Sequence, residues 1–211
     1  MTGYDIIGDV HGCAGQLEEL LTALGYQING TTGEYRHPSR RAIFVGDLID
    51  RGDEQLRVLE IVKAMVDHAG AQIVMGNHEF NAICYATPHP DKPGDFLRSH
   101  ENPTNTAHHL AFLEQLTAEQ REHYIGWFKT LPLWLDLGGI RVIHACWNHD
   151  SMKVVTDATG GNRPLKPVAE RLDDGESEEA DHYHQVGDVQ EQRQAGGLGG
   201  RAPEHQAGDG Q

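Results

Sequence analysis

Three times in its first eighty residues the chain runs from a short apolar segment into a loop of glycine and ionisable residues. The three stretches read "DIIGDVHG" (5–12), "IFVGDLIDRGD" (43–53) and "IVMGNHE" (73–79). Leucine and valine at helical spacing follow the first two loops, in residues 17–24 and 56–66. A strand, a polar loop and a helix in succession form the repeat from which parallel sheets are built. The pattern therefore predicts an α/β (α+β) fold.

The rest of the first 150 residues indicates further elements of both kinds. Residues 86–105 contain four prolines and are expected to form a long surface loop. The segment 117–120, "TAEQ", has the sequence of a capping box and predicts a helix of about a dozen residues. Two apolar runs flank Gly138 and Gly139, which predicts a pair of antiparallel strands joined by a hairpin turn.

The charge and the cysteines bound the classes of partner and compartment. The chain has 32 acidic and 17 basic residues in 211, a formal net charge of −15, which argues against a nucleic-acid backbone or an anionic membrane as a partner. Cys13, Cys84 and Cys146 form no CxxC pair and provide neither a disulfide framework nor a thiolate zinc site. With no signal sequence or long apolar segment, a cytoplasmic location is expected.

The composition changes abruptly near residue 168. Residues 170–211 hold eleven acidic and three basic residues and contain no Ile, Phe, Met or Trp. A segment with so little apolar surface cannot offset the entropy of ordering. We therefore expect a folded domain over 1–167 and a disordered acidic tail over 168–211.

Side chains suited to catalysis or metal binding follow each of the three strands predicted before the polar loops. They are Asp9, His11, Asp47, Asp50, Arg51, Asn77, His78 and, after a fourth strand, His144. Because the carboxyl ends of parallel strands meet at one edge of a sheet, we expect these loops to converge. Any one of these residues alone is more often structural, but four such strand ends in one small domain favour a shared site. Carboxylates, an amide and imidazoles together suit Mn, Fe or Zn.

The three motifs resemble a known family. "GDVHG", "GDLIDRGD" and "GNHE", in this order over residues 8–79, are similar to the signature blocks of calcineurin-like metallophosphoesterases. The resemblance is closest to the phosphoprotein phosphatase type and its bacterial, diadenosine tetraphosphatase-like branch. It implies a β-sandwich flanked by helices. A dinucleotide-binding loop fits less well, because its GxGxxG pattern requires glycine where Val10 stands.

The resemblance implies a site with two divalent metal ions. Asp9 and His11 would bind the first ion, Asp47 would bridge the two, and Asn77 and His144 would bind the second. Manganese is favoured, with iron or zinc as alternatives. Two such ions can bridge a hydroxide and neutralise a phosphoryl group during its attack.

The resemblance also assigns the residues that act on substrate. His78 would protonate the leaving group with Asp50 orienting its ring, and Arg51 would bind the phosphate. The expected activity is that of a hydrolase of phosphoric ester or anhydride bonds. Its substrate would be a phosphoprotein, a dinucleoside polyphosphate or a small phosphate ester.

One block of the family is not evident in the sequence. The family has a further metal-binding histidine that follows a glycine late in the chain, but no histidine after His144 follows a glycine. We therefore expect the terminal strands of the domain to be missing and the second metal site to lack a ligand, unless His182 or His184 supplies it. A metal- or phosphate-binding protein with weak or no turnover is the alternative function.

Five other side chains are expected to be structural. Adjacent residues on a helix point about 100° apart, so His108 and His109 are expected to be exposed to solvent rather than paired on a metal. Trp127, Trp134 and Trp147 might stack on a nucleotide base, but packing in the core or against the hairpin is favoured.

Overall fold

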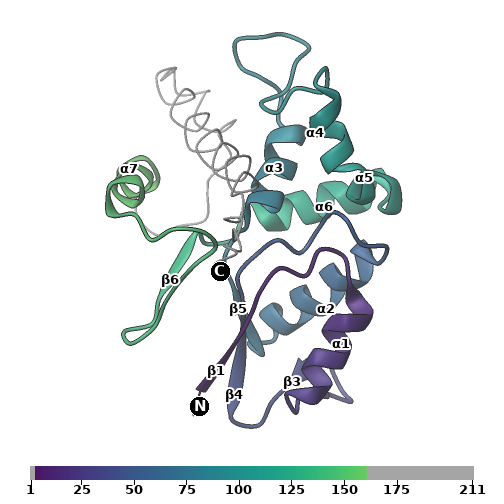
Figure 1. The fold of residues 1–211 in the computed structure, drawn as a ribbon, viewed down its shortest axis with the longest axis vertical. Helices are drawn as coiled ribbons and strands as arrows, with labels where there is room; N and C mark the ends of the chain where they lie inside the picture. Colours follow the sequence, from purple (N-terminus) through teal and green to yellow (C-terminus); the bar gives the residue numbers. More distant parts are fainter. Residues whose placement is uncertain (1–2, 161–211) are drawn as a thin grey trace, which may run out of the picture. The chain divides into compact units, whose positions relative to one another are not determined.

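The protein is described by a computed structural model that covers residues 3–160, so the predicted tail over 168–211 lies outside the described residues. A three-stranded parallel sheet lies at its centre, with strand order β1 (Gly3–Ile7), β4 (Arg40–Phe44) and β5 (Ala71–Ile73) (Figure 1). These strands precede the three polar loops, as the sequence predicts.

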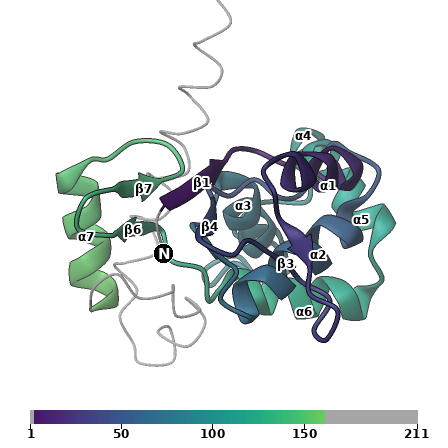
Figure 2. The same ribbon diagram turned by 90° about the horizontal axis from the view of Figure 1, so that it is seen from below.

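Two helices cover one face of this sheet. They are α1 (Ala14–Ala23) and α2 (Gln55–Asp67), and both views place them on the same side of the strands (Figures 1 and 2). The apolar side of α2 is completely buried through Val58, Leu59, Val62 and Met65. Both helices follow the amphipathic pattern of the sequence, because burial of that pattern stabilises them more than helix propensity does.

A hairpin lies on the opposite face of the sheet (Figures 1 and 2). Its strands β6 (Trp134–Asp136) and β7 (Arg141–Ile143) pair antiparallel around Gly138, as predicted. Val142 packs against Ile43 and Val74 in one buried apolar cluster. In a β-sandwich this hairpin belongs to the second layer. Within residues 3–160 it is the part of that layer that the structure describes.

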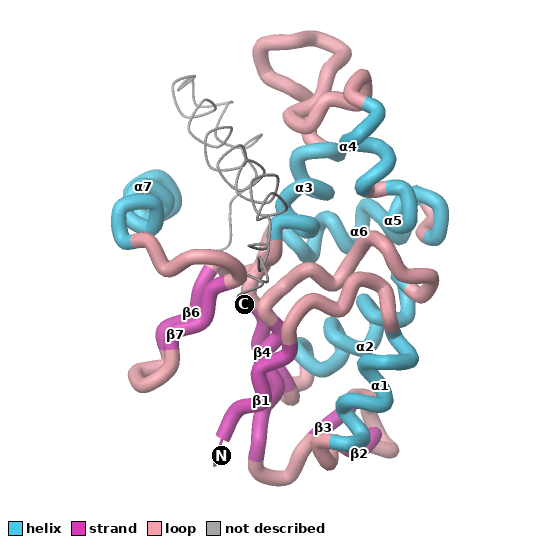
Figure 3. The backbone as a smooth tube through the Cα atoms, in the orientation of Figure 1, coloured by secondary structure: helices cyan, strands magenta, loops and turns pink. Residues whose placement is uncertain are grey.

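Four more helices form a second group (Figure 3). They are α3 (Asn77–Ala86), α4 (Pro103–His108), α5 (Leu110–Gln115) and α6 (Ala118–Phe128). The predicted capping box begins α6, where the Thr117 side chain accepts from the backbone N–H of Gln120. Within residues 3–160, every helix is too short or too polar to serve as a membrane span.

Four features of the fold were not predicted from the sequence. The hairpin of β2 (Gln27–Ile28) and β3 (Tyr35–Arg36) connects α1 to β4, and α4 and α5 lie between the proline-rich loop and α6. Helix α7 (His149–Thr159) follows β7, and none of its residues is fully buried.

Candidate active site

The polar loops meet at the carboxyl edge of the parallel sheet. The loop after β1 carries Asp9 and His11, the loop after β4 carries Asp47 and Asp50, and α3 begins at Asn77 soon after β5. The convergence predicted from strand order is therefore present.

The backbone of these loops is strained. His11, Asp47, Asp50 and Arg51 have φ of 47°, 53°, 70° and 72°, a region that non-glycine residues rarely adopt. Each such residue costs about 1–3 kcal/mol, which the surrounding structure must offset. Backbone hydrogen bonds between the loops do so in part, because His11 N–H donates to the carbonyl of Asp47 (2.9 Å) and Gly52 N–H donates to that of His11 (2.8 Å).

Two motif glycines permit the loops to approach closely. A Cβ on Gly46 would lie 2.2 Å from the backbone nitrogen of Gly76, and one on Gly76 would lie 2.2 Å from Oδ1 of Asp47. Any side chain at either position would push the two loops apart. This contact explains why glycine precedes Asp47 in the second motif and Asn77 in the third.

Glu79, the fourth residue of the "GNHE" motif, fastens the second and third loops together. Its fully buried carboxylate accepts hydrogen bonds from the backbone N–H groups of Asp47 (2.9 Å), Leu48 (2.7 Å) and Gly76 (2.9 Å). Burial and the nearby negative charge of Asp47 raise the pKa of Glu79, although these three donors oppose the rise. The sequence analysis did not assign Glu79 a role, although it lies within a quoted motif.

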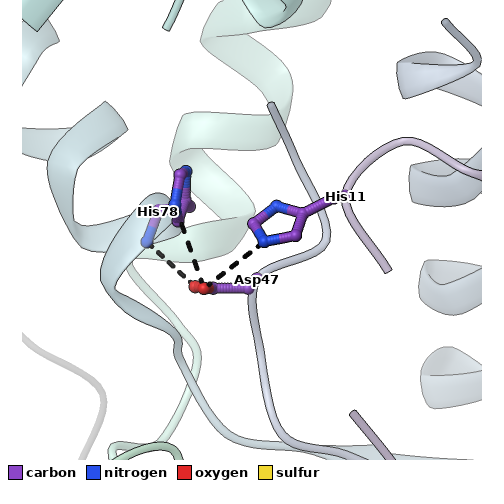
Figure 4. Close-up of side chains that lie close together, drawn as sticks. All are labelled: His11, Asp47 and His78. Atoms are coloured by element: carbon purple, nitrogen blue, oxygen red, sulfur yellow. Dashed lines mark hydrogen bonds and ion pairs between the residues drawn. The ribbon is translucent and has the colours of Figure 1, made fainter. Parts of the chain in front are cut away.

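Asp47 is the centre of the site. Its Oδ2 lies 3.5 Å from Nε2 of His144, 3.9 Å from Nε2 of His11 and 4.0 Å from Nε2 of His78. Figure 4 shows its carboxylate between the rings of His11 and His78. One carboxylate thus faces imidazole nitrogens from three different segments of the chain.

The environment of His11 fits a metal ligand. Nδ1 lies 2.8 Å from the carbonyl oxygen of Ile49, which can only accept, so Nδ1 carries the proton and Nε2 of the neutral ring presents a lone pair. Nε2 is buried and has no hydrogen-bond partner. It lies 3.8 Å from Oδ2 of Asp9 and 3.9 Å from Oδ2 of Asp47. A backbone carbonyl that orients the ring in this way is typical of metal-bound histidine.

His144 has the same environment. Nδ1 lies 2.7 Å from the carbonyl oxygen of Val45 and donates to it, so Nε2 of the neutral ring presents a lone pair to Oδ1 of Asn77 at 2.9 Å. Two atoms with lone pairs at this distance repel each other unless a cation lies between them or the ring is protonated. This donor set therefore also fits a divalent ion.

The structure brings the other four predicted ligands close to Asp47 or to a residue that faces it. One group of donor atoms that could hold an ion comprises His11, Asp47 and His78, and a second comprises Asp9, Asp47 and His144, each within 4.8 Å of one another. Asp47 belongs to both groups, which is the arrangement that a bridging ligand requires. The first group includes His78, which was predicted to protonate the leaving group and not to bind metal.

Asp50 lies between two imidazoles. Its Oδ2 is 2.6 Å from Nδ1 of His78 and its Oδ1 is 2.9 Å from Nδ1 of His109. Burial alone would raise the pKa of Asp50, but the hydrogen bonds to His109 and His78 outweigh it and hold that pKa below its usual value. Burial alone would lower the pKa of His78, but the bond to Asp50 and the charge of Asp47 raise it.

The expectation for the pair His108 and His109 is wrong for one of them. His108 is exposed as predicted, whereas His109 is 4% exposed and bonds to Asp50. The chain leaves α4 at this point and begins α5, so the ring of His109 turns inward. No motif surrounds His109 that could have indicated this.

The remaining predicted residues lie at the surface or in the core. Arg51 is exposed on the strained turn beside Asp50. Trp127 and Trp134 are buried, in agreement with the packing interpretation, and Trp147 is half-buried with the guanidinium of Arg141 5.2 Å from its ring. His182 and His184 lie outside the described residues.

These motifs and this geometry agree with one family. The family model described as calcineurin-like phosphoesterase matches residues 4–192, and the chain belongs to that family. Its fold is accordingly the metallophosphoesterase fold, and the family uses divalent metal ions. The resemblance stated from the sequence motifs is confirmed.

Within the family, the chain is similar to bacterial bis(5'-nucleosyl)-tetraphosphatases PrpE. It is 37% identical over 142 residues to the one from Oceanobacillus iheyensis, covering 67% of this chain and 54% of that protein. It is 35% identical over 149 residues to the one from Geobacillus thermodenitrificans, covering 69% and 58%. The chain thus spans little more than half the length of these relatives. A solved metallophosphoesterase from Sphaerobacter thermophilus matches at 23% identity and a TM-score of 0.40, covering 65% of this chain and 44% of that one.

Proposed function

We propose that this protein hydrolyses phosphoanhydride bonds of dinucleoside polyphosphates with the aid of two divalent ions. One observation carries the proposal: the carboxylate of Asp47 faces Nε2 of His11 and Nε2 of His144, whose Nδ1 atoms lie against backbone carbonyl oxygens, and stands beside a buried carboxylate–imidazole pair. A hydrolase of this kind needs both parts, one to hold the ions and one to deliver a proton.

The proposed ligands divide into two sets that share Asp47. Asp9 and His11 hold one ion, and Asn77 and His144 hold the other. Manganese suits this mixture of carboxylate, amide and imidazole donors, with iron or zinc as alternatives. When bound, the ions neutralise phosphoryl charge and make a water molecule acidic enough to attack near neutral pH.

His78 and Arg51 act on the substrate in this proposal. The buried carboxylate of Asp50 accepts a hydrogen bond from Nδ1 of His78. This bond fixes the ring so that Nε2 points toward Asp47, 4.0 Å from its Oδ2. From there Nε2 can protonate the oxygen that leaves phosphorus. Arg51, exposed on the turn beside Asp50, binds phosphate oxygens through its planar guanidinium.

The choice of substrate class rests on the relatives. The two relatives described above are named as bis(5'-nucleosyl)-tetraphosphatases. Such a substrate has several adjacent phosphate groups, which suits a site with two ions and an exposed arginine beside Asp50.

The three cysteines bear on the cellular compartment. Free cysteines at all three positions suit a reducing compartment, and we propose the cytoplasm.

The test is turnover of the full chain on three substrates. Diadenosine tetraphosphate, p-nitrophenyl phosphate and a phosphoserine peptide are compared at equal concentration, after chelation and with added Mn²⁺, Mg²⁺ or Zn²⁺. We expect Mn²⁺-dependent hydrolysis, fastest on diadenosine tetraphosphate. Chromatography of the products distinguishes ATP plus AMP from two ADP.

Asp47→Asn serves as the matched inactive variant. It keeps the size of the side chain and an oxygen for the backbone N–H of His78, which bonds to Oδ1 of Asp47 at 3.1 Å, but it removes the shared charge. We expect turnover and bound metal to fall while the unfolding midpoint without metal stays close to that of the parent. Metal binding by the parent chain without any turnover would refute hydrolysis and leave a metal-binding protein.

A further inference from the structure

His109 is a buried titratable residue that lies in none of the sequence motifs but contacts a motif residue. It occupies the junction of α4 and α5, 59 residues after Asp50, and its side chain is 5% exposed. Its Nδ1 lies 2.9 Å from Oδ1 of Asp50. A buried imidazole aimed at the carboxylate that orients His78 invites a functional explanation.

Aromatic packing fixes the orientation of the His109 ring. Phe112 stacks on it with centroids 4.8 Å apart and an interplanar angle of 26°, and Tyr85 lies 5.4 Å away at 57°. Phe112 in turn contacts Phe128 of α6. The ring is therefore packed against aromatic side chains of α3 and α5, which restrict the rotation of its Nδ1 away from Asp50.

The hydrogen bonds of Asp50 show what His109 supplies. Both oxygens of an ionised carboxylate can only accept, so Nδ1 of His78 and Nδ1 of His109 must each carry a proton. Asp50 is 3% exposed on its side chain, so water does not replace a missing donor readily. Without the donor of His109, Oδ1 would be buried and lack its side-chain partner, and the carboxylate would be free to rotate.

We propose that His109 is a positioning residue: by donating to Oδ1 of Asp50 it holds Oδ2 against Nδ1 of His78 and so aims Nε2 of His78 at the reaction centre. This inference rests on the proposed function, in which His78 is the proton donor. It assigns a role in the site to the helical segment between the third motif and β6.

Two amide substitutions separate the donor from the mere presence of a polar side chain. The amide nitrogen of His109→Asn can take the place of Nδ1, whereas that of His109→Gln reaches one carbon further and misplaces the donor. We expect His109→Asn to keep kcat within about threefold of the parent. We expect His109→Gln to lower kcat by about 10- to 100-fold with little change in KM, as a misplaced catalytic group does.

The neighbour His108 provides the matched control. It is exposed, and His108→Gln should leave both constants unchanged. In the background of His78→Asn, His109→Gln should cause no further loss of kcat, because the ring that it positions is absent. Equal kcat for His109→Asn and His109→Gln, or a full further loss in the His78→Asn background, would overturn the proposal.

A spectroscopic measurement decides the proposal without any turnover. In the full chain labelled with ¹⁵N-histidine and free of paramagnetic ions, the Nδ1 proton of His78 should resonate far downfield and exchange slowly with water. His109→Gln should shift or broaden that signal, and His109→Asn should preserve it. An unchanged His78 signal in a folded His109→Gln protein would refute the proposal, whereas absence of turnover in the parent chain would refute only the proposed function.

Discussion

The three imidazole rings around Asp47 are each oriented by a partner at Nδ1. Carbonyl oxygens of Ile49 and Val45 fix the rings of His11 and His144, and Asp50 fixes that of His78. In each case Nδ1 is the proton donor and Nε2 is directed toward Asp47. The same tautomer at three rings directs three Nε2 atoms at one carboxylate, and in the proposed function two of them bind metal and one carries a proton.

The role of His78 is tested by its replacement with asparagine. His78→Asn should lower kcat by about 10²- to 10⁴-fold, the range for a lost general acid, while the bound metal stays nearly constant. The loss should be smaller on p-nitrophenyl phosphate, because a good leaving group needs little protonation. Steady-state kinetics and metal analysis check both parts. If metal is lost together with activity, His78 is a ligand, as its place beside His11 and Asp47 also permits.

Asp50 should make stability depend on pH. Its pKa is lowered in the folded protein, so its ionised form stabilises the fold above about pH 4, the usual pKa of aspartate, and this contribution is lost as pH falls through the lowered value. Asp50→Asn should therefore reduce the free energy of unfolding by about 1–3 kcal/mol at pH 7, and by less at pH 3.

Urea unfolding with a chelator present measures this difference at both pH values. The exposed Asp91 provides the control, since Asp91→Asn should give a small difference at either pH. A constant difference between the parent and Asp50→Asn from pH 7 to pH 3 would mean that the charge of Asp50 does not stabilise the fold.

At the scale of elements, the side chain of Glu79 helps to join α3 to the loop after β4. Glu79 lies in the first turn of α3 and accepts three backbone N–H groups, two of them from the neighbouring loop. Glu79→Gln replaces one accepting oxygen by a donor, so at least one of these buried N–H groups loses its partner. We expect a loss of about 1–3 kcal/mol in the free energy of unfolding and weaker metal binding.

Glu119 is the matched control for this prediction. It also lies in the first turn of a helix, α6, but it is exposed. Glu119→Gln should change the free energy of unfolding by less than about 0.5 kcal/mol, as surface substitutions usually do. Chemical unfolding and metal titration of both variants compare them directly. Equal effects of the two substitutions would show that Glu79 does not join the loops.

The elements that the sequence predicted share a local cause. Strands β1 and β4 and helices α1 and α2 follow apolar periodicity, and the capping box of α6 lies within four residues. Helices α4 and α5 have six residues each, too few for periodicity to show. Helix α7 buries none of its residues completely.

The same distinction holds within the site. The motif residues could be identified because each block carries its own glycine and ionisable side chains over a few positions. His109 could not, because its role depends on a partner 59 residues away and on aromatic rings from other helices. Glu79 is a motif residue, but its role depends on backbone N–H groups that no sequence pattern displays.

At the scale of the molecule, bound metal should act on unfolding rather than on folding. The proposed ligands extend from Asp9 to His144, so the complete set exists only in the assembled domain. An ion that binds only the folded state stabilises it by about 2.7 kcal/mol at a hundredfold excess over its Kd. We expect Mn²⁺ to slow unfolding and to leave the refolding rate within about twofold. Stopped-flow fluorescence measures both rates, and faster refolding with Mn²⁺ would show that ligands assemble early.

The hydrogen bond between His144 and the carbonyl of Val45 spans 99 residues of sequence. During synthesis at about 5–20 residues per second, Val45 would leave the ribosome roughly 5–20 s before His144. In that interval a nascent chain can already form β1, α1 and β4, but one of its metal ligands has not yet been made. If His144 binds the second ion as proposed, that site is complete only in a chain whose β6–β7 hairpin has docked, so in the cell metal content would report whether this step of folding has taken place.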